Sequence, residues 1–514
     1  MSHDRRPRFT RHATVLGALL ALALPAAASA EVFVVDRLDD DASAMLCSPG
    51  PPGDCSLRGA VRAANANGLS DTIILPGGQY SLTLAGANED FALTGDLDIR
   101  GPLTIQAAPG AHPVVEQTVG DRVFHSSVVF FTGAVSLVGP LTLVGGTAVA
   151  SSGLENGGSI YVFRSGSLTL TDVTLAGGTA PDDGGCLYFA NPTSPAALAL
   201  SGVQITGCAA GDSGGGLFAQ VGDTSVTLTR VAIEGNQAGS SGGGLRLIAS
   251  TAPGATVILE SILRDNAAGD LPGAVALGGG AHFGAVPVAL LRSTVSGNQA
   301  GGAAAHSGQG GGLFIENSAV LIQNSTLSGN RSQGTAFGTG SAMELSVSTV
   351  GVEFSTVVGA AGPAFESIRS SLSSGLDFEA SILQARCFGS FGGTLTSSGL
   401  NAEKPIDGAG STTCGLTHVS DVFTTEPLLR PLAGYGGPTP THALLDGAPG
   451  LLPAVPSGTC NDPVGGPIDQ RSAPRTLLFC EPGSYEHGAA PPGPWIFSDG
   501  FESGDTGAWS LTVP

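Results

Sequence analysis

The chain has 514 residues, including 79 Gly and 33 Pro, and its 42 acidic side chains outnumber 21 basic ones to give a formal net charge of −21. A hydrophobic fraction of 42% excludes a disordered chain, and a charged fraction of 12% excludes a long charged helical rod. The acidic balance also argues against nucleic acid and anionic membrane faces as partners, because both repel negative charge.

The first thirty residues have the pattern of a secretion signal. Four arginines between Arg5 and Arg11 precede an apolar run from Val15 to Leu24, and Ala28-Ser29-Ala30 is a small-residue cleavage site. A retained anchor is the alternative, but the run is shorter than a membrane-spanning helix requires. We therefore expect the mature chain to be secreted or displayed at the outer cell surface, without a transmembrane anchor.

A short helix is predicted near the start of the mature chain. Leu57, Ala60, Val61 and Ala64 form an apolar stripe with helical spacing that stops before Gly68. The alternating segment 71–76 is predicted to be the first strand. Such a helix can cap the open end of a strand array, which would otherwise expose unpaired backbone groups.

A unit of about 30 residues recurs from about residue 100 to about residue 385. Each unit has two alternating apolar positions, a bend, two more alternating positions and then Gly, often followed by Asn. The last apolar positions lie 28 to 32 residues apart and are Leu143, Leu175, Ile205, Ile233, Leu263, Val295, Leu327 and Val357. A period of two indicates strands, and Gly-rich units of this length predict a β-solenoid whose coils stack on one another.

Equivalent positions keep their character from one unit to the next. Three residues after the last apolar position stand Asn236, Asn266, Asn298 and Asn330. Coils of a solenoid stack about 4.8 Å apart, so these amides can hydrogen-bond along the stack. A β-propeller is the alternative architecture, but its blades need about 40 residues or more.

Three parts of the chain resemble exported bacterial β-helix proteins. The run 55–66, followed by 71–80, resembles the CSLREA domain, with Gly59 where that motif has Glu. The Gly-Gly-x-apolar and Gly-Asn motifs resemble repeats of polymorphic outer-membrane proteins. A choice-of-anchor Q region is similar to segments 436–444, 469–471 and 480–486.

The resemblance implies an all-β fold, namely a right-handed single-stranded parallel β-helix (a pectate-lyase-like solenoid) of about ten coils at a bacterial surface. The expected divisions are a signal peptide (1–30), a helical cap with the first coils (31–100), the repeats (101–400), a C-terminal cap (401–488), and a Pro/Gly linker with a short tail (489–514). This fold hosts both enzymes and adhesins, so it does not define a reaction.

The eight cysteines fall into four pairs that are close in sequence. An even number of cysteines in an exported chain favours disulfides. The pairing is not determined by sequence, but we expect neighbours to pair: Cys47 with Cys55, Cys186 with Cys208, Cys387 with Cys414, and Cys460 with Cys480.

One predicted strand of each coil carries an outward stripe. Strand alternation turns the residue after the apolar position of the Gly-Gly motif away from the core. These residues are Tyr161, Tyr188, Phe218, Arg246, His282, Phe314 and Glu344, of which the first six are our candidate binding residues. Aromatic faces with polar neighbours suit carbohydrate or a surface protein. The alternative is that another segment covers them as a second core.

A charged strip is predicted at the bend. Its members are Arg230, Glu234, Glu260, Arg264 and Arg292. A polysaccharide lyase or hydrolase could use carboxylates as acid and base and arginine to neutralise a uronate. The alternative is a structural ladder of opposite charges on adjacent coils.

An acidic group near the N-terminus is a weak candidate for calcium. Glu89, Asp90, Asp96 and Asp98 offer hard oxygen ligands, but the spacings of known calcium loops are missing. A solvated acidic face is the alternative, and we otherwise expect no cofactor.

The preferred hypothesis is a non-catalytic β-helix for binding, adhesion or display that contacts carbohydrate or protein along an outer face. The alternative is a polysaccharide lyase or glycoside hydrolase that acts on an acidic polysaccharide at the bend. Gly-x-Ser-x-Gly, His-Glu-x-x-His and phosphate-loop motifs are missing from the sequence.

Overall fold

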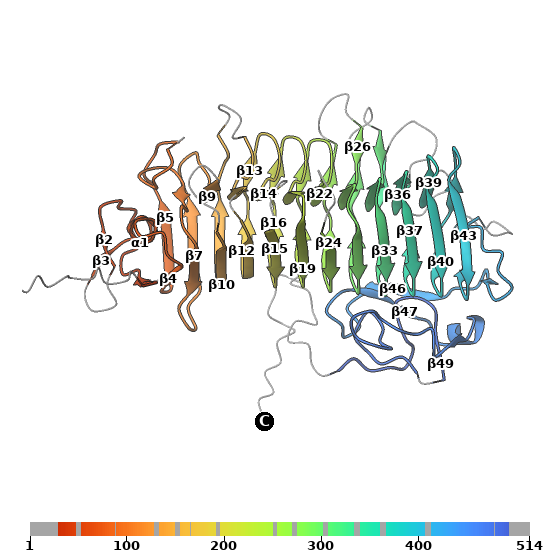
Figure 1. Ribbon diagram of the computed structural model, residues 1–514. Helices are drawn as coiled ribbons and strands as arrows, with labels where there is room; N and C mark the ends of the chain where they lie inside the picture. The colour runs from red at the N-terminus through yellow and green to blue at the C-terminus, as the bar shows by residue number, and fades with distance from the viewer. Residues whose placement is uncertain are drawn as a thin grey trace, which may run out of the picture.

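The computed structural model describes residues 29–47, 53–87, 89–127, 133–149, 155–164, 166–191, 196–249, 254–269, 275–301, 307–333, 340–359, 366–406, 413–476 and 478–492. Most of the expected signal peptide and the tail after residue 492 lie outside these ranges. Figure 1 shows an elongated stack of coils that runs from the N-terminal region to β43, with the C-terminal region against one side. The predicted parallel β-solenoid is confirmed, with about nine full turns.

Three parallel sheets run along the described part of the stack. The largest, the long sheet, has 24 strands, the second has eleven and the third has six. The long sheet contains β1 (Val32–Val34), β4 (Asp71–Leu75), β5 (Gly78–Leu82), β7 (Leu103–Ala107), β8 (Pro113–Gln117), β10 (Val135–Gly145), β12 (Leu168–Ala176), β15 (Ala196–Ser201), β16 (Gln204–Thr206), β19 (Thr224–Thr229), β20 (Ala232–Glu234), β23 (Thr256–Leu259), β24 (Ile262–Arg264), β28 (Val288–Leu291), β29 (Thr294–Ser296), β33 (Ala319–Gln323), β34 (Thr326–Ser328), β37 (Thr349–Glu353), β38 (Thr356–Val358), β40 (Gly375–Glu379), β41 (Ile382–Gln384), β43 (Thr394–Gly399), β44 (Ala402–Glu403) and β45 (Val422–Phe423).

The eleven-stranded sheet takes one strand from each successive coil. It contains β6 (Leu97–Asp98), β9 (Phe124–Ser127), β11 (Ile160–Phe163), β14 (Leu187–Asn191), β18 (Leu217–Val221), β22 (Leu245–Ala249), β27 (Ala281–Gly284), β32 (Leu313–Glu316), β36 (Met343–Ser346), β39 (Ile368–Ser371) and β42 (Cys387–Gly389). The six-stranded sheet contains β13 (Thr179–Ala180), β17 (Ala209–Ala210), β21 (Gln237–Ala238), β25 (Ala267–Ala268), β30 (Gln299–Ala300) and β35 (Arg331–Ser332).

The remaining described elements are short. They are the helix α1 (Leu57–Asn65), the 3-10 turn η1 (Ala448–Leu451), and the strand pairs β2 (Met45–Leu46) with β3 (Asp54–Cys55), β26 (Ala276–Leu277) with β31 (Gly308–Gln309), β46 (Leu429–Ala433) with β47 (Thr441–Leu444), and β48 (Val455–Pro456) with β49 (Phe479–Cys480). None of the helices in the described ranges is long and apolar enough to cross a membrane.

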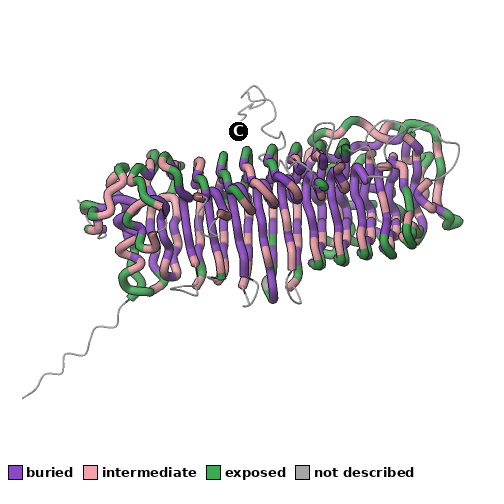
Figure 2. Tube along the Cα trace, turned by 90° about the horizontal axis from the view of Figure 1, so that it is seen from above, coloured by how far each residue is buried: buried purple, intermediate pink, exposed green. Residues whose placement is uncertain are grey.

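Positions about 30 residues apart are direct neighbours in the long sheet. Leu175 pairs with Ile205, Ile205 with Ile233, and Ile233 with Leu263. These apolar side chains are almost fully buried and belong to one core that runs through the stack. Figure 2 shows this core as purple segments that recur along every coil. The repeat therefore predicted the three-dimensional register correctly.

The bend between paired strands of the long sheet has a left-handed backbone. Asp172, Arg230, Glu260 and Arg292 have φ values of 53°, 52°, 50° and 46°, and Gly202 occupies the same place with 64°. Residues other than glycine rarely adopt this backbone conformation, so the surrounding ladder must hold it in place. One left-handed residue turns the chain from the first strand to the second in each of these coils.

Buried polar ladders hold consecutive coils together. The side-chain Oδ1 of Asn298 accepts hydrogen bonds from the backbone N–H and the Nδ2 of Asn266, both at 3.0 Å. Nδ2 of Asn298 donates to Leu263 O and to Oδ1 of Asn330, both at 2.9 Å. A parallel ladder at the bend consists of Ser261, Ser293, Ser325, Ser355 and Ser381. Each hydroxyl accepts a hydrogen bond from the backbone N–H of the equivalent residue one coil earlier, which is Val231 for Ser261 and a serine for the others.

The N-terminal helix caps the stack as predicted, and the strands β1, β2 and β3 precede it in the chain. Ser56 is the N-cap, and its hydroxyl accepts a hydrogen bond from the Gly59 N–H at 2.9 Å. A Cβ atom at Gly59 would lie 1.9 Å from the carbonyl oxygen of Ala44, so the close approach of the chain requires glycine there. The prediction that 71–76 is the first strand was wrong, because β1 pairs with β4 in parallel.

All four expected disulfides are formed. They join Cys47 to Cys55, Cys186 to Cys208, Cys387 to Cys414, and Cys460 to Cys480. Such bonds persist in oxidising compartments, which is consistent with an extracellular protein.

The C-terminal region lies along the side of the later coils (Figure 1). Outward threonines of β29, β34 and β38 are buried beneath it. Thr294 accepts a hydrogen bond from Gln470 at 2.9 Å, and Thr326 donates to the same residue at 2.6 Å. This polar contact fixes the region against the long sheet.

We expect Asn298→Ala to lower the free energy of unfolding by about 2 kcal/mol or more, because it leaves the Asn266 N–H buried without a partner and removes the side-chain hydrogen bond to the Leu263 carbonyl. The measurement is the urea midpoint of the mature chain. Gln204→Ala is the control, since it removes an amide from an exposed position of β16 and should change the midpoint little. Equal effects of the two substitutions would contradict a stabilising role for the ladder.

Candidate functional site

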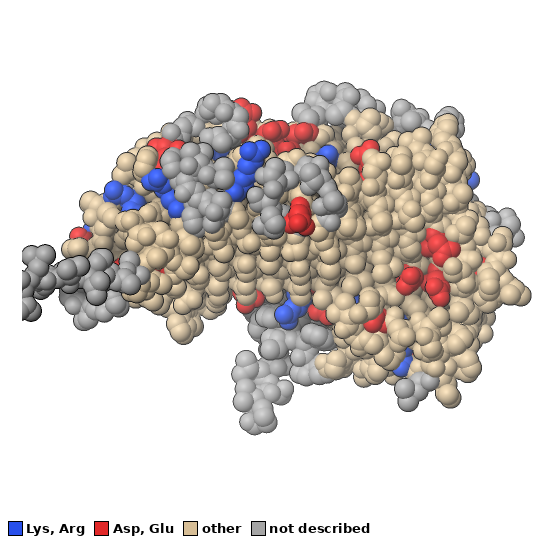
Figure 3. Space-filling model, in the orientation of Figure 1, with Lys and Arg blue, Asp and Glu red and all other residues tan. Residues whose placement is uncertain are grey.

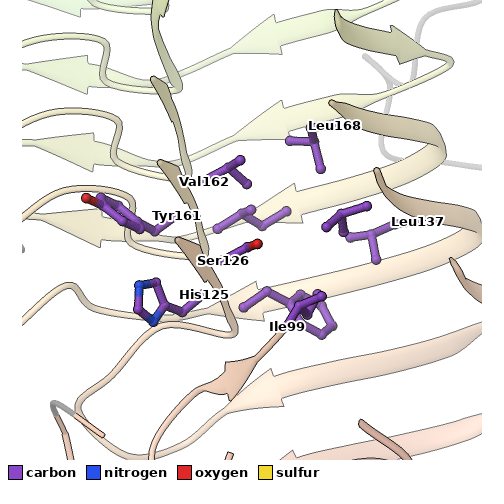
Figure 4. Close-up of a pocket in the computed structure, with 10 residues that line it drawn as sticks. Ile99, His125, Ser126, Leu137, Tyr161, Val162 and Leu168 are labelled. Carbon is purple, nitrogen blue, oxygen red and sulfur yellow. The ribbon is translucent and has the colours of Figure 1, made fainter. Parts of the chain in front are cut away.

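The predicted stripe forms one continuous column on the eleven-stranded sheet. Consecutive pairs in the register join Asp98, His125, Tyr161, Tyr188, Phe218, Arg246, His282, Phe314, Glu344, Arg369 and Phe388. We call this column the outer ladder. Figure 4 shows His125 and Tyr161 on the opposite side of their strands from the core residues Leu137, Val162 and Leu168. The small cavity drawn there has a volume of about 10 Å³, room for about one water.

The stripe points away from the main core as predicted, but its aromatic residues are buried, as in the alternative of a second core. Tyr161, Tyr188 and Phe218 are only 4%, 8% and 5% exposed, and they form a second apolar cluster with Ala190. The rings stack at centroid distances of 5.2 and 5.1 Å with an interplanar angle of 6°. The spacing of the coils thus lets each ring cover the face of the next, which leaves no open aromatic platform on these three residues.

The middle of the outer ladder is polar. Arg246 donates a hydrogen bond to Nδ1 of His282 at 2.5 Å, and Nε2 of His282 lies 3.6 Å from the carboxylate of Glu316. Burial lowers the pKa of His282 to about 4, and the positive charge of Arg246 acts in the same direction. His282 is therefore neutral near pH 7. The ring of Phe314 packs edge-on against it at 5.0 Å.

A second outward column, the outer strip, runs beside the outer ladder. It consists of Phe163, Ala190, Gln220, Ile248, Gly284, Glu316 and Ser346. Except for the buried Ala190, these residues are half-buried, so they form the accessible part of this face. Gln220, Glu316 and Ser346 place hydrogen-bonding groups on either side of Ile248 and Gly284. Sequence reasoning passed over this column because it considered only the first outward position.

Three carboxylates meet at the corner that precedes this sheet. One oxygen each of Asp182, Asp183 and Asp212 lies within 4.8 Å of the others. Burial raises the pKa of Asp183 to about 7, and the charges of Asp182 and Asp212 add to the effect. Burial lowers the pKa of Arg246, and the charges of Asp183 and Asp212 act in the opposite direction. Figure 3 shows acidic side chains along this upper edge of the molecule. The aspartates stand one or two residues before the Gly-Gly motifs at 184–185 and 214–215, which was a usable signal in the sequence.

The N-terminal acidic group is brought together only in part. Asp90 and Asp98 converge on Nδ1 of His125 at 3.9 and 2.9 Å, which is the second place where the described residues could hold a metal ion. Glu89 instead accepts hydrogen bonds from backbone N–H groups of Phe91, Leu93 and Thr94. Burial and neighbouring carboxylates raise the pKa of Asp96 well above its usual value. Calcium binding by the four predicted residues stays a prediction.

The charged strip at the bend is paired from coil to coil. Arg264 lies 3.0 Å from Glu234, and Arg292 lies 3.0 Å from Glu260. Arg292 is also buried by the C-terminal region, where it donates to Asp462 at 2.8 Å. Arg230, at the bend one coil before Glu260, is exposed. This arrangement matches the structural ladder that was the alternative for these residues.

The sequence did not indicate the partners of the later bend positions. Asn324 donates to Asp462 at 2.9 Å and accepts from Arg475 at 2.7 Å. Arg475 is buried and lies 3.3 Å from Glu486. The C-terminal region is therefore fastened to the bend by charged and amide groups more than 130 residues away in sequence.

A shallow hollow of about 460 Å³ lies on the outer face of the long sheet. It is lined by residues of β23, β28, β33 and β37, including Val257, Pro287, Ala289 and Leu321, and its lining contains no charged side chain. Figure 3 shows a group of acidic side chains farther along, over β37 and β40. With two threonines as its only polar side chains, the hollow has little to orient a ligand.

Comparison with known proteins does not assign the chain to a family. No family model matches the chain, and no curated protein matches it. Among solved structures, the crystal structure of pectate lyase Pel9A is similar, with a TM-score of 0.38 and 13% sequence identity over 66% of this chain and 79% of the pectate lyase.

We expect Asp183→Asn to stabilise the protein at pH 8 and to have little effect at pH 4. A carboxylate whose folded pKa is about 7 stays protonated in the folded state while the unfolded chain ionises, so its stabilising contribution is lost as pH rises from about 4 to about 7. The loss is on the order of 2–4 kcal/mol. Asparagine keeps the oxygen that accepts from the Ser213 N–H.

The measurement is the melting temperature of both forms across this pH range. Asp223→Asn, at an exposed position before β19, is the matched control and should show no such pH dependence. A variant that is less stable than the wild type at pH 8 would contradict the unfavourable burial of the Asp183 carboxylate.

Proposed function

We propose that this protein is a non-catalytic β-helix that binds a neutral glycan along the outer strip of the eleven-stranded sheet. The observation that carries the proposal is the placement of hydrogen-bonding side chains in one column beside a rigid, buried ladder. Gln220, Glu316 and Ser346 project from coils at a spacing of about 4.8 Å, with Ile248 and Gly284 between them. Sugar hydroxyls need such fixed donors and acceptors next to small apolar surfaces.

The charges favour a neutral ligand. The chain carries a net charge of −21, and Glu316 and the three corner aspartates border the eleven-stranded sheet. A uronate would meet repulsion here unless a cation were bound first. A neutral chain of sugars avoids that repulsion and can still donate hydroxyl protons to the carboxylate of Glu316.

The state of the charged groups favours binding without catalysis. Arg264 and Arg292 neutralise Glu234 and Glu260, and the C-terminal region covers Arg292. His282 is held by Arg246, which makes its Nδ1 an acceptor already in use. The groups that an acid–base mechanism would require are thus occupied with one another.

Several features support export to the cell surface. The sequence begins with a secretion-signal pattern, and four disulfides cross-link the described chain. The resemblance to the CSLREA and choice-of-anchor Q regions points to a bacterial surface as the place of display.

The proposal predicts that the labelled mature protein binds neutral oligosaccharides on a glycan array. Ile248→Glu places a charge in the outer strip and should weaken binding at least about tenfold, equivalent to about 1.4 kcal/mol. Leu321→Glu makes the same change at a half-buried position in the hollow and should leave binding unchanged. Melting temperatures verify that both variants fold. Loss of binding in Leu321→Glu alone would move the site to the hollow, and binding to no neutral glycan would refute the proposal.

A polysaccharide lyase is the second candidate, favoured by the carboxylates of Asp182, Asp183 and Asp212 beside Arg246. Oxygen ligands of this kind suit Ca²⁺, which could hold an acidic polysaccharide near the arginine. The test is the release of unsaturated uronate from polygalacturonate and alginate, with and without Ca²⁺. We expect no release. Calcium-dependent activity that Asp183→Asn removes would establish the lyase, while loss of activity in Arg230→Ala or Arg264→Ala would place it at the bend.

A further inference from the structure

We propose that Nε2 of His282 and the carboxylate of Glu316 form a subsite for one hydroxyl group of the bound glycan, which enters above Gly284. The subsite rests on the proposed function and specifies where on the outer strip the protein contacts the ligand. Three independent features support it, namely the tautomer of the histidine, its missing partner, and the space next to it.

The contact with Arg246 fixes the tautomer of His282. A guanidinium has only donors, so the 2.5 Å hydrogen bond makes Nδ1 the acceptor. In the neutral ring the proton must then sit on Nε2. The imidazole is thereby oriented as a hydrogen-bond donor toward Glu316.

This donor has no hydrogen-bond partner in the described structure. His282 is only 1% exposed, and its Nε2 is buried without an acceptor within bonding distance. The carboxylate of Glu316, at 3.6 Å, is too far for a good hydrogen bond. A buried donor without a partner costs free energy that a ligand oxygen can recover. Glu316 is half-buried, so its side chain connects the buried nitrogen to the surface.

Gly284 provides the space for that oxygen. A Cβ atom built there would lie 3.8 Å from Nε2 of His282 and 3.3 Å from Cγ2 of Ile248. Gly284 does not have a left-handed backbone, so its conformation would accept a side chain. The absence of a side chain at Gly284 therefore leaves room for a ligand atom beside His282.

A hydroxyl is the group that satisfies both sides of this gap. It can accept a hydrogen bond from the N–H at Nε2 and at the same time donate one to Glu316. The nearby imidazole of His282 and the positive charge of Arg246 hold the pKa of Glu316 below its usual value, so its carboxylate is an acceptor at neutral pH. A ketone or ether oxygen would satisfy the histidine alone, and an ammonium group would satisfy only the glutamate. The subsite thus selects a sugar or another polyol.

The test uses Gly284→Ala, which fills the space while the backbone stays unstrained, and Glu316→Gln. Gly351→Ala is the matched control, because the added Cβ meets Leu321 at an ordinary 3.6 Å on a different face. For the neutral oligosaccharide that binds best on the array, we expect Gly284→Ala to weaken affinity at least about tenfold and Glu316→Gln to weaken it several-fold. The control should match the wild type.

A second measurement reports on the histidine directly. In protein labelled with ¹⁵N-histidine, the Nε2 resonance of His282 should shift when that oligosaccharide, or cellobiose at high concentration, is added, and Gly284→Ala should remove the shift. Glycan binding that is unaffected by Gly284→Ala, with no change at Nε2, would overturn the subsite and leave the proposed function standing. Failure of every neutral glycan to bind, together with an unmoved Nε2 resonance, would overturn both.

Discussion

The structure depends on one constraint, which is that every coil must present its backbone to the next in the same register. Hydrogen bonds between parallel strands impose this, and a slip of one residue would turn all core side chains of a strand outward. The length of the bend shows how strictly this register is maintained. Two residues separate the paired strands at 202–203, 230–231, 260–261, 292–293 and 324–325. Variation in repeat length falls elsewhere, for example between Ala249 and Thr256 and between Ala268 and Ala281.

The left-handed bend and the polar ladders are two consequences of this register. A charged or amide residue with φ near 50° is unfavourable in isolation. In the stack, the serine that follows satisfies the N–H of its counterpart one coil earlier, as Ser293 does for Ser261. Each Asn of the second ladder makes a similar set of bonds on both sides. The cost of ordering one coil is therefore offset only when its neighbours are present, which makes the stack cooperative.

The sequence was sufficient to predict the stack but not the surroundings of its outer surface. Period, alternation and the recurring Asn identified which residues become vertical neighbours, because those features repeat locally. The outward direction of Tyr161 and Tyr188 was predicted for the same reason. Their burial was only the alternative, because the sequence does not show that rings on adjacent coils stack on one another. The contacts of Arg292 and Asn324 with Asp462 were also beyond prediction, since a non-repeating region supplies the partner. The outer strip was missed because only the first outward position of each strand was considered, and because Gly284 and Glu316 differ from their counterparts and so form no repeating pattern.

Burial of the outer ladder determines where recognition can take place. In a solenoid, equivalent side chains on adjacent coils contact one another. A column of aromatic rings or of alternating charges therefore makes its contacts within the protein and leaves few for an external ligand. Tyr161, Tyr188 and Phe218 do this through stacking, and Glu260 and Arg292 do it through ion pairing. A side chain stays available to an external ligand where the residue type changes along the column. The transition from Phe218 to Arg246 and His282 is such a break, and it leaves a buried donor next to the glycine of the adjacent column. A regular stack thus supplies the rigidity, and its irregular coil supplies the polar group that an external hydroxyl can reach.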